Sequence, residues 1–331
     1  MEDEDEQAAR LIQSVLAELG WDADAGHVAR RVRRLDLGLP LEDEFSVVCG
    51  WLGRCQLLHK LDQQQIPSGS RDRYQVPDLL GVFSTQNSER PVLIEVKSSK
   101  KQTLSFTESY LRKLEAYANL LGAPLLIAWK FHGIWMLFEA RHMTKAVKNF
   151  NIRYSTALTE NLLGVLAGDI AYKVGPGVGL HFSIRKRELL NSHKEGSVQT
   201  DEWLMEVEDV MFTDGDGATR TDLDGEVQAL VATWDLEEKQ EHDPTHVKWS
   251  FVAGSEGMQF AHVALVRLLH WELPRDGKLN WRKLLAAKKV RRNIDDFSSA
   301  LKTALREKIV SHIFHIRPKT MPDFINETFE R

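Results

Sequence analysis

Apolar residues follow two patterns along this chain, namely helical spacing and short apolar runs typical of strands. Each change of pattern marks the start of another expected element. Leu41 to Leu58 has apolar positions at helical spacing and three carboxylates in its first turn, where acids suit the helix dipole. This helix is expected to pass into a strand near residues 59–65. Two short apolar runs, Val76 to Phe83 and Pro91 to Ser98, then flank a polar stretch. This part of the sequence predicts a helix, a strand and a β-hairpin.

Helical spacing returns between Thr107 and Leu121, and a glycine and then a proline follow as a stop signal. Two further apolar runs, Leu125 to Trp129 and Ile134 to Phe138, are expected to be strands. The order from residue 41 is therefore helix, three strands, helix and two strands. This order predicts an α/β fold with a central mixed sheet flanked by helices.

Beyond residue 150 the pattern is less regular. We expect a helix over Thr159 to Val174 and a strand over Leu180 to Ile184, which is a candidate for the first sheet. Later segments are expected as strands at 203–212 and 226–235, helices near 257–271, 280–289 and 294–308, and a strand at 311–316. They predict a C-terminal α+β domain whose end suits either a winged-helix arrangement or a helical packing module. The expected division is a helical lead-in at 1–38, a first domain at 39–195 and a C-terminal domain at 196–331.

Composition limits the class of protein. No run of about 18 apolar residues is present to span a bilayer, and the first residues are acidic, so we expect a soluble, cytoplasmic protein with no membrane partner. The formal net charge of −5 argues against a protein that coats nucleic acid non-specifically, although local basic clusters such as Lys97, Lys100 and Lys101 remain compatible with phosphate contacts. Cys49 and Cys55 are expected to be reduced thiols.

Charged residues interrupt the two apolar runs of the expected hairpin. Asp78 lies in the first run, and Glu95 and Lys97 lie in the second. Because side chains alternate along a strand, Glu95 and Lys97 share one face about 7 Å apart. Pairing the strands brings Asp78 alongside Glu95, and the carbonyl of Val96 offers one more oxygen. Two carboxylates and a lysine suit a hard divalent cation that assists phosphodiester hydrolysis, whereas the alternative is an ordinary solvated face.

Pro77-Asp78, a spacer of sixteen residues and Glu95-Val96-Lys97 resemble the signature of the PD-(D/E)xK nuclease superfamily, which includes restriction endonucleases and Holliday-junction resolvases. The resemblance covers about 100 residues of the chain. It implies a further acidic metal ligand on the helix before the hairpin. Glu44 matches best by position, and Glu42 and Asp43 compete with it.

The resemblance also implies a polar group on the helix after the hairpin. Tyr110, Lys113 and Tyr117 lie there at three- and four-residue spacing, but the glutamine common in the superfamily is absent. The role of that helix in the site is therefore left open.

The implied function is a metal-dependent endonuclease that uses Mg²⁺, or Mn²⁺ as a substitute, and most often acts on DNA. Asp78, Glu95 and Lys97 are the expected catalytic residues, and Asp78, Glu95, Val96 and Glu44 are the expected metal ligands. The C-terminal half is expected to select the DNA target, to bind a protein partner or to form a homodimer. The alternative is a catalytically idle nuclease fold that serves as a nucleic-acid-binding or regulatory module. RNA as the substrate also remains open.

Overall fold

The structure is a computed structural model that describes residues 41–62, 65, 67, 69–84, 90–196, 198–270, 284 and 297–325. The expected helical lead-in at 1–38 lies outside the described residues. So does nearly all of the helix expected at 280–289. The winged-helix interpretation depends on that helix and stays a prediction.

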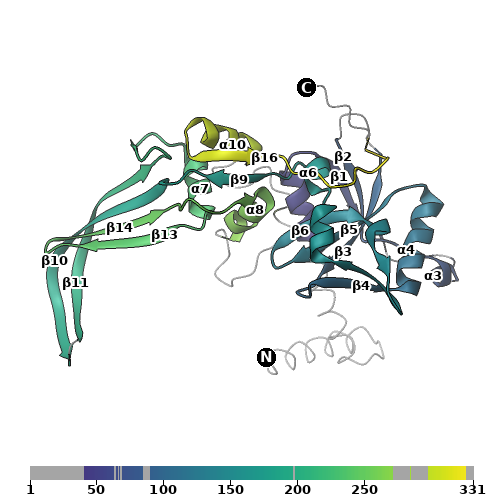
Figure 1. The fold of residues 1–331 in the computed structure, drawn as a ribbon, viewed down its shortest axis with the longest axis horizontal. Helices are drawn as coiled ribbons and strands as arrows, with labels where there is room; N and C mark the ends of the chain where they lie inside the picture. The colour runs from purple at the N-terminus through teal and green to yellow at the C-terminus, as the bar shows by residue number, and fades with distance from the viewer. Residues whose placement is uncertain are drawn as a thin grey trace, which may run out of the picture.

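A mixed sheet forms the centre of the first half (Figure 1). In the described part of the chain it has five strands, in the order β1 (Cys55–Lys60), β2 (Leu79–Phe83), β3 (Val92–Ser98), β5 (Leu125–Phe131) and β6 (Ile134–Glu139). Strands β3 and β5 are parallel, whereas the other neighbouring pairs are antiparallel. Strands β2 and β3 are the expected hairpin. The sheet confirms the predicted α/β fold with a central mixed sheet.

The first helix is shorter than the sequence predicted. Residues 41–51 are helical, and strand β1 already begins at Cys55, whereas we expected helix as far as Leu58. Gly53 has a φ of +98°, a conformation that glycine adopts without steric cost, and it turns the chain into the strand. The apolar residues after Gly53 suit either element, so their spacing alone does not locate this break.

Helices cover both faces of the sheet. Residues 41–51 pack on one face, in a cluster with Leu79, Ile94 and Val96. Helix α4 (Glu108–Leu121) packs on the other face, in a cluster with Leu93 and Ile127. Because Leu93 lies on this second face, the alternation of β3 places Glu95 and Lys97 there too.

Helix α4 has strong end signals. The Thr107 side chain caps its start by accepting a hydrogen bond from the backbone N–H of Tyr110 at 3.3 Å, and Gly122 ends it in the left-handed conformation. A small antiparallel sheet packs beside it, formed among the described residues by β4 (Thr103–Thr107), β8 (Asn149–Arg153) and β7 (Thr144–Lys145). This sheet was not predicted from the sequence.

The helix expected over Thr159 to Val174 was wrong. This region instead contains α5 (Tyr154–Thr159), α6 (Leu163–Ala167) and strand β9 (Ala171–Val174). Gly168, at a φ of +92°, ends α6 and sends the chain into the strand. Nearly every residue of α6 is buried, so the segment has no polar face whose period would reveal its bounds.

Strand β9 starts the second half, where it is the middle strand of a sheet that, among the described residues, also contains β15 (Gln259–Phe260) and β16 (Val310–Phe314). Helices of the second half pack together here: α7 (Gly225–Thr233), α8 (Ala261–His270) and α10 (Phe297–Arg306). The strand expected at 226–235 was wrong, because this segment is α7. Its interior is almost wholly buried, and a short, continuous apolar run fits a buried strand equally well.

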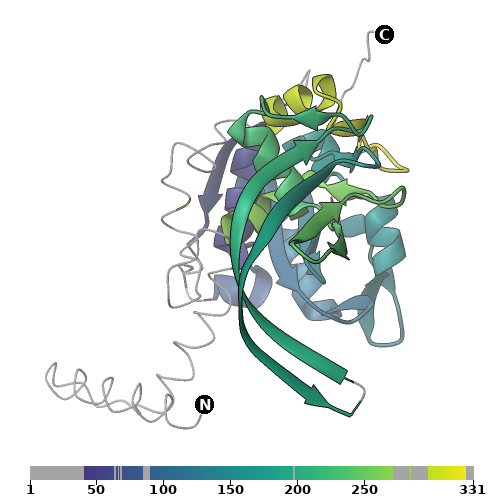
Figure 2. The same cartoon turned by 90° about the vertical axis from the view of Figure 1, so that its left-hand side faces the viewer.

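A long hairpin leaves the body of the protein (Figures 1 and 2). It consists of β10 (Gly179–Glu195) and β11 (Val198–Thr213), paired from Gly179 with Thr213 to Glu195 with Val198. Residues 180–184 therefore belong to β10 and to a separate sheet, not to the first sheet. That sheet also contains, in the described residues, β12 (Thr219–Arg220), β13 (Glu237–His242) and β14 (His246–Val252). The domain boundary expected between residues 195 and 196 falls at the tip of this hairpin, where β10 ends.

The two halves share buried contacts. His262 of α8 is fully buried, and its Nε2 accepts a hydrogen bond from the backbone N–H of Trp135 in β6 at 3.0 Å. Its Nδ1 lies 2.7 Å from Oδ2 of Asp169, which also accepts the His262 backbone N–H through Oδ1 at 3.0 Å. Every polar atom of the imidazole is thus satisfied, and the first sheet is joined to the second half. Among the described residues, no helix is long and apolar enough to cross a membrane.

Candidate active site

The hairpin of β2 and β3 brings Asp78, Glu95 and Lys97 together. Leu79 pairs with Ile94, so Asp78 and Glu95 occupy the next opposing positions along the two strands. Oδ2 of Asp78 accepts a hydrogen bond from the backbone N–H of Val96 at 2.8 Å. The Lys97 ammonium forms an ion pair with Oε1 of Glu95 and lies 3.9 Å from Oδ2 of Asp78. The geometry therefore forms one cluster from Asp78 and from Glu95 and Lys97, although sixteen residues separate Asp78 from Glu95 in the sequence.

Burial sets the electrostatics of this cluster. Glu95 is only 1% exposed, and burial together with the nearby charge of Asp78 raises the pKa of its carboxyl to about 7. Burial also raises the pKa of Asp78, although the Lys97 ammonium and the Val96 N–H act in the opposite direction. The two carboxylates share the ammonium of Lys97. Such a pair gains from a further positive charge, because each ionised acid makes ionisation of the other costlier.

Helix α4 supplies a further contact. The Tyr110 hydroxyl donates a hydrogen bond to Oε1 of Glu95, and burial and that carboxylate raise the pKa of the phenol. Lys113 points elsewhere, because its ammonium donates to the backbone carbonyl of Arg71 at 2.8 Å. Tyr117 packs against the apolar cluster under the helix. Of the three polar candidates on this helix, Tyr110 is the one that reaches Glu95.

Glu44, the acid that matched best by position, does not join the cluster. Its carboxylate accepts hydrogen bonds from the Lys130 ammonium at 2.5 and 2.6 Å and from Nε1 of Trp135 at 3.0 Å. Trp135 belongs to the apolar cluster on the face that residues 41–51 cover, which is opposite to the face of Glu95. Helical spacing placed the candidate acids on one helix, but only the structure shows which group each of their side chains faces.

Glu42, one of the two competing acids, lies nearer. Burial raises the pKa of its carboxyl, and the charge of Asp78 raises it further. Lys60 on β1 forms ion pairs with Glu42 at 3.1 Å and with Asp43 at 2.6 Å, and its charge also lowers the pKa of Asp78. Lys60 was not predicted as part of the site. The expected strand near residues 59–65 begins several residues after the start of the observed β1, which ends at Lys60.

The cluster suits a divalent cation. Oε2 of Glu95 is buried without a hydrogen-bond partner, although a buried carboxylate oxygen normally has one. Asp78 supplies a second hard oxygen donor, and the carbonyl of Val96, 3.2 Å from the Lys97 ammonium, a third. Within the described residues, no three His, Cys, Asp or Glu side chains form a complete ligand set. Water or substrate phosphate would therefore complete the coordination, as is usual for Mg²⁺.

Comparisons with known proteins find matches to part of the chain. The family described as archaeal Holliday junction resolvase (hjc) matches residues 65–168. A solved structure of Archaeoglobus fulgidus Hjc, a Holliday junction resolvase from an archaeal hyperthermophile, is 22% identical. That match covers 36% of this chain and 89% of the other, with a TM-score of 0.30. No curated protein matches the sequence.

The region matched by the family contains Asp78 just before β2, Glu95 and Lys97 on β3, and Tyr110 on helix α4. Residues 65–168, which contain Asp78, Glu95 and Lys97, are therefore similar to the archaeal Holliday junction resolvase family.

Proposed function

We propose that this protein is a metal-dependent endonuclease that hydrolyses phosphodiester bonds in DNA, and that branched DNA, above all the four-way junction, is its substrate. The observation that carries this proposal is the convergence of Asp78, Glu95 and Lys97, with the buried Oε2 of Glu95 left unsatisfied. The match of residues 65–168 to the resolvase family supports the choice of branched DNA.

Asp78, Glu95 and the carbonyl of Val96 would hold the ion, which we propose to be Mg²⁺ with Mn²⁺ as a substitute. Glu42, rather than Glu44, is the acid on the first helix that is placed to assist. When bound, such an ion polarises the phosphate and lowers the pKa of a bound water. The hydrogen bond from Val96 N–H fixes Asp78, and the Tyr110 hydroxyl orients Glu95, so both acids are positioned before substrate arrives.

Lys97 has a separate role in this proposal. Its ammonium is about one-third exposed, so it can leave Glu95 and approach a phosphate or an attacking water. A positive charge in that place stabilises the negative charge that develops on phosphate oxygens as the bond to water forms. The lysine thus acts mainly in the transition state, whereas the two acids act already in the ground state.

The surface beside α4 offers contacts for the DNA backbone. A shallow groove of about 650 Å³ has the basic residues Arg73, Arg112 and Lys113 in its lining, together with the acids Asp72 and Glu108, from α3 (Ser70–Arg73) and α4. Lys100 and Lys101 are exposed just after β3. We propose that these basic side chains bind phosphates, because such contacts give position and affinity without sequence selectivity.

The deciding experiment compares a labelled four-way junction with a linear duplex and with single-stranded RNA of the same sequence. Each substrate is incubated with the full chain in Mg²⁺, Mn²⁺, Ca²⁺ or excess EDTA. We expect cleavage of the junction in Mg²⁺ and Mn²⁺, binding with little cleavage in Ca²⁺, and none in EDTA. Equal cleavage in EDTA contradicts metal dependence, and preferred cleavage of RNA contradicts the substrate. A folded protein that binds the junction but never cuts it favours an idle nuclease fold.

A homodimer is also part of this proposal, because symmetrical cleavage of a junction requires two active sites. Mass measurement by light scattering, alone and with junction DNA, tests it directly. A single copy bound to a junction that is nevertheless cut on two strands contradicts the dimer.

A further inference from the structure

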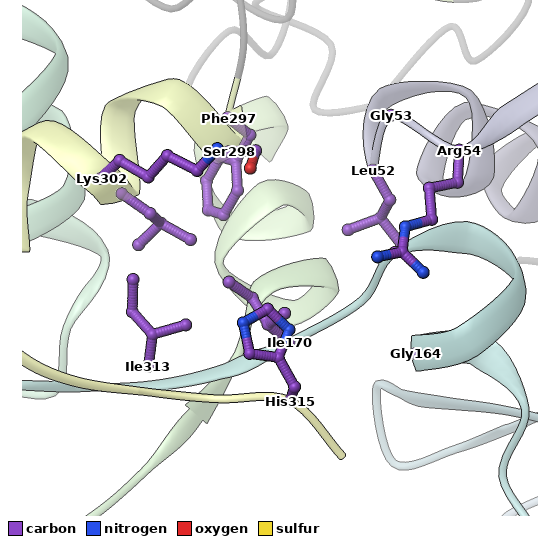
Figure 3. Close-up of a pocket in the computed structure, with 12 residues that line it drawn as sticks. Leu52, Gly53, Arg54, Gly164, Ile170, Phe297, Ser298, Lys302, Ile313 and His315 are labelled. Atoms are coloured by element: carbon purple, nitrogen blue, oxygen red, sulfur yellow. The ribbon is translucent and has the colours of Figure 1, made fainter. Parts of the chain in front are cut away.

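A cavity that is separate from the groove beside α4 lies where the first half of the chain meets the C-terminal elements (Figure 3). Its volume is about 420 Å³. Residues Leu52 and Arg54 line it from the turn before β1, Gly164 and Gly168 from the ends of α6, and Phe297 and Lys302 from α10. The cavity lies beyond the end of the 41–51 helix and contains none of the residues of the nuclease cluster. A cavity of this size holds a small ligand.

Basic side chains from separate elements converge on this cavity. Figure 3 shows the Arg54 guanidinium, the Lys302 ammonium and the His315 ring directed toward the same space. No acidic residue is among the lining residues that the structure describes. Arg54 donates one hydrogen bond from Nη1 to the carbonyl of Val165 at 3.3 Å, so most of its five N–H donors remain available. Within the described residues, Lys302 and His315 have no hydrogen-bond or ion-pair partner.

The backbone fixes Arg54 at the edge of this cavity. A Cβ at Gly168 would lie 3.0 Å from the carbonyl of Leu52 and 3.1 Å from Cγ of Arg54. The φ of +92° at Gly168 also disfavours other residues. Glycine therefore allows the stem of Arg54 to pack directly on the end of α6.

The segment that carries His315 is held equally firmly. A Cβ at Gly164 would lie 2.6 Å from the carbonyl of Ile316, so only glycine allows this approach. The backbone N–H of Lys319 donates to the carbonyl of Thr159 at 2.7 Å, and that of Thr320 donates to Oε2 of Glu160 at 3.0 Å. The chain after β16 thus returns to the first half and spans the cavity.

We propose that this cavity binds the phosphate of a nucleotide. Basic donors without an opposing carboxylate favour an anion, and guanidinium and ammonium groups are the usual partners of phosphate. The apolar side chains Leu52, Ile170 and Phe297 line the same space and suit the less polar remainder of the ligand. Two sources provide this chemistry, namely a free nucleotide and the phosphorylated 5′ end of a DNA strand. Binding of either ligand in this cavity would not depend on the cleavage activity proposed for the Asp78 cluster.

The test measures binding to the full chain in EDTA, so that cleavage plays no part. The probes are dAMP, a short single-stranded oligonucleotide with a 5′ phosphate, and the same oligonucleotide with a 5′ hydroxyl. We expect binding of dAMP, of the phosphorylated oligonucleotide or of both, and inorganic phosphate should compete. Binding of dAMP alone identifies a free nucleotide as the ligand, whereas binding of the phosphorylated oligonucleotide alone identifies a DNA end.

The variants Lys302→Gln and His315→Gln should each weaken this binding about tenfold, which is the effect of losing one charge-assisted hydrogen bond. Arg306→Gln is the matched control, because Arg306 is an exposed basic residue of the same helix that does not line the cavity. The proposal is overturned if no probe binds at millimolar concentration. It is also overturned if dAMP does not bind and the two oligonucleotides bind equally well, or if Arg306→Gln weakens binding as much as Lys302→Gln does.

Discussion

The carboxylate of Asp78 accepts a hydrogen bond from the backbone N–H of Val96, so the acid just before β2 is tied to the residue between Glu95 and Lys97. This bond requires an acceptor at position 78, whereas metal binding requires a charge. Asp78→Asn should therefore keep the fold and lose at least about a hundredfold in cleavage rate. Thermal unfolding by circular dichroism and junction cleavage in Mg²⁺ check both expectations. Cleavage at the wild-type rate would place the site elsewhere.

Glu95 and Lys97 should be separable by metal binding. Glu95→Ala should lose both the ion and the activity, because it removes the buried oxygen that has no partner. Lys97→Ala should lose about a hundredfold or more in cleavage rate yet still bind the ion, since its charge acts in the transition state. Calorimetric titration with Mn²⁺ decides between them. A folded Lys97→Ala protein that no longer binds Mn²⁺ contradicts the role given to the lysine.

Glu42 and Glu44 provide a matched pair of substitutions on one helix. Glu42→Gln should weaken Mn²⁺ binding, because this carboxylate is close enough for Asp78 to affect its pKa. Glu44→Gln should leave Mn²⁺ affinity unchanged and lower stability by about 2 kcal/mol, since it removes the charge that pairs with Lys130. Urea unfolding and calorimetry measure the two effects. If Glu44→Gln weakens Mn²⁺ binding and Glu42→Gln does not, then Glu44 is the metal ligand on this helix.

Tyr110 should act by positioning Glu95. Removing its hydroxyl frees Oε1 of Glu95 from one of its two partners without changing the shape of the side chain. Tyr110→Phe should therefore reduce Mn²⁺ affinity and the cleavage rate by about tenfold each, as is usual for groups that orient a metal ligand. Tyr117→Phe, on the same helix, is the control and should change neither. Equal effects of the two variants would point to packing of the helix instead.

A protein that ends near residue 195 should fail to fold, although the long hairpin is dispensable for folding. The cut removes Leu230, Leu265 and Leu301, which are buried in the same core as the first half. In contrast, residues 188–196 of the hairpin are all exposed. Replacing residues 189–203 with an Asn-Gly turn should keep the melting temperature within a few degrees, because Glu188 and Leu204 already face each other. A soluble, cooperatively folding 1–195 fragment would contradict this prediction.

The sequence by itself determined those features that depend on neighbouring residues. Alternation within β3 placed Glu95 and Lys97 on one face, and the cap at Thr107 and the stop at Gly122 set the ends of α4. The hairpin then brought Asp78 to the same place, because pairing of adjacent strands follows from a short connection. The mixed sheet and the cluster of Asp78, Glu95 and Lys97 therefore followed from local periodicity and turn signals.

Only the tertiary structure decided the features that depend on distant segments. Glu42 and Glu44 both lie in the first turn of one helix, and the position of β1 and β5 determines that Lys60 meets one and Lys130 the other. Buried segments such as α7 carry no polar face, so their apolar run suits a helix or a strand until neighbours surround it. The cavity between Arg54 and Lys302 likewise exists only because chain segments about 250 residues apart pack together, and no local pattern records such a contact.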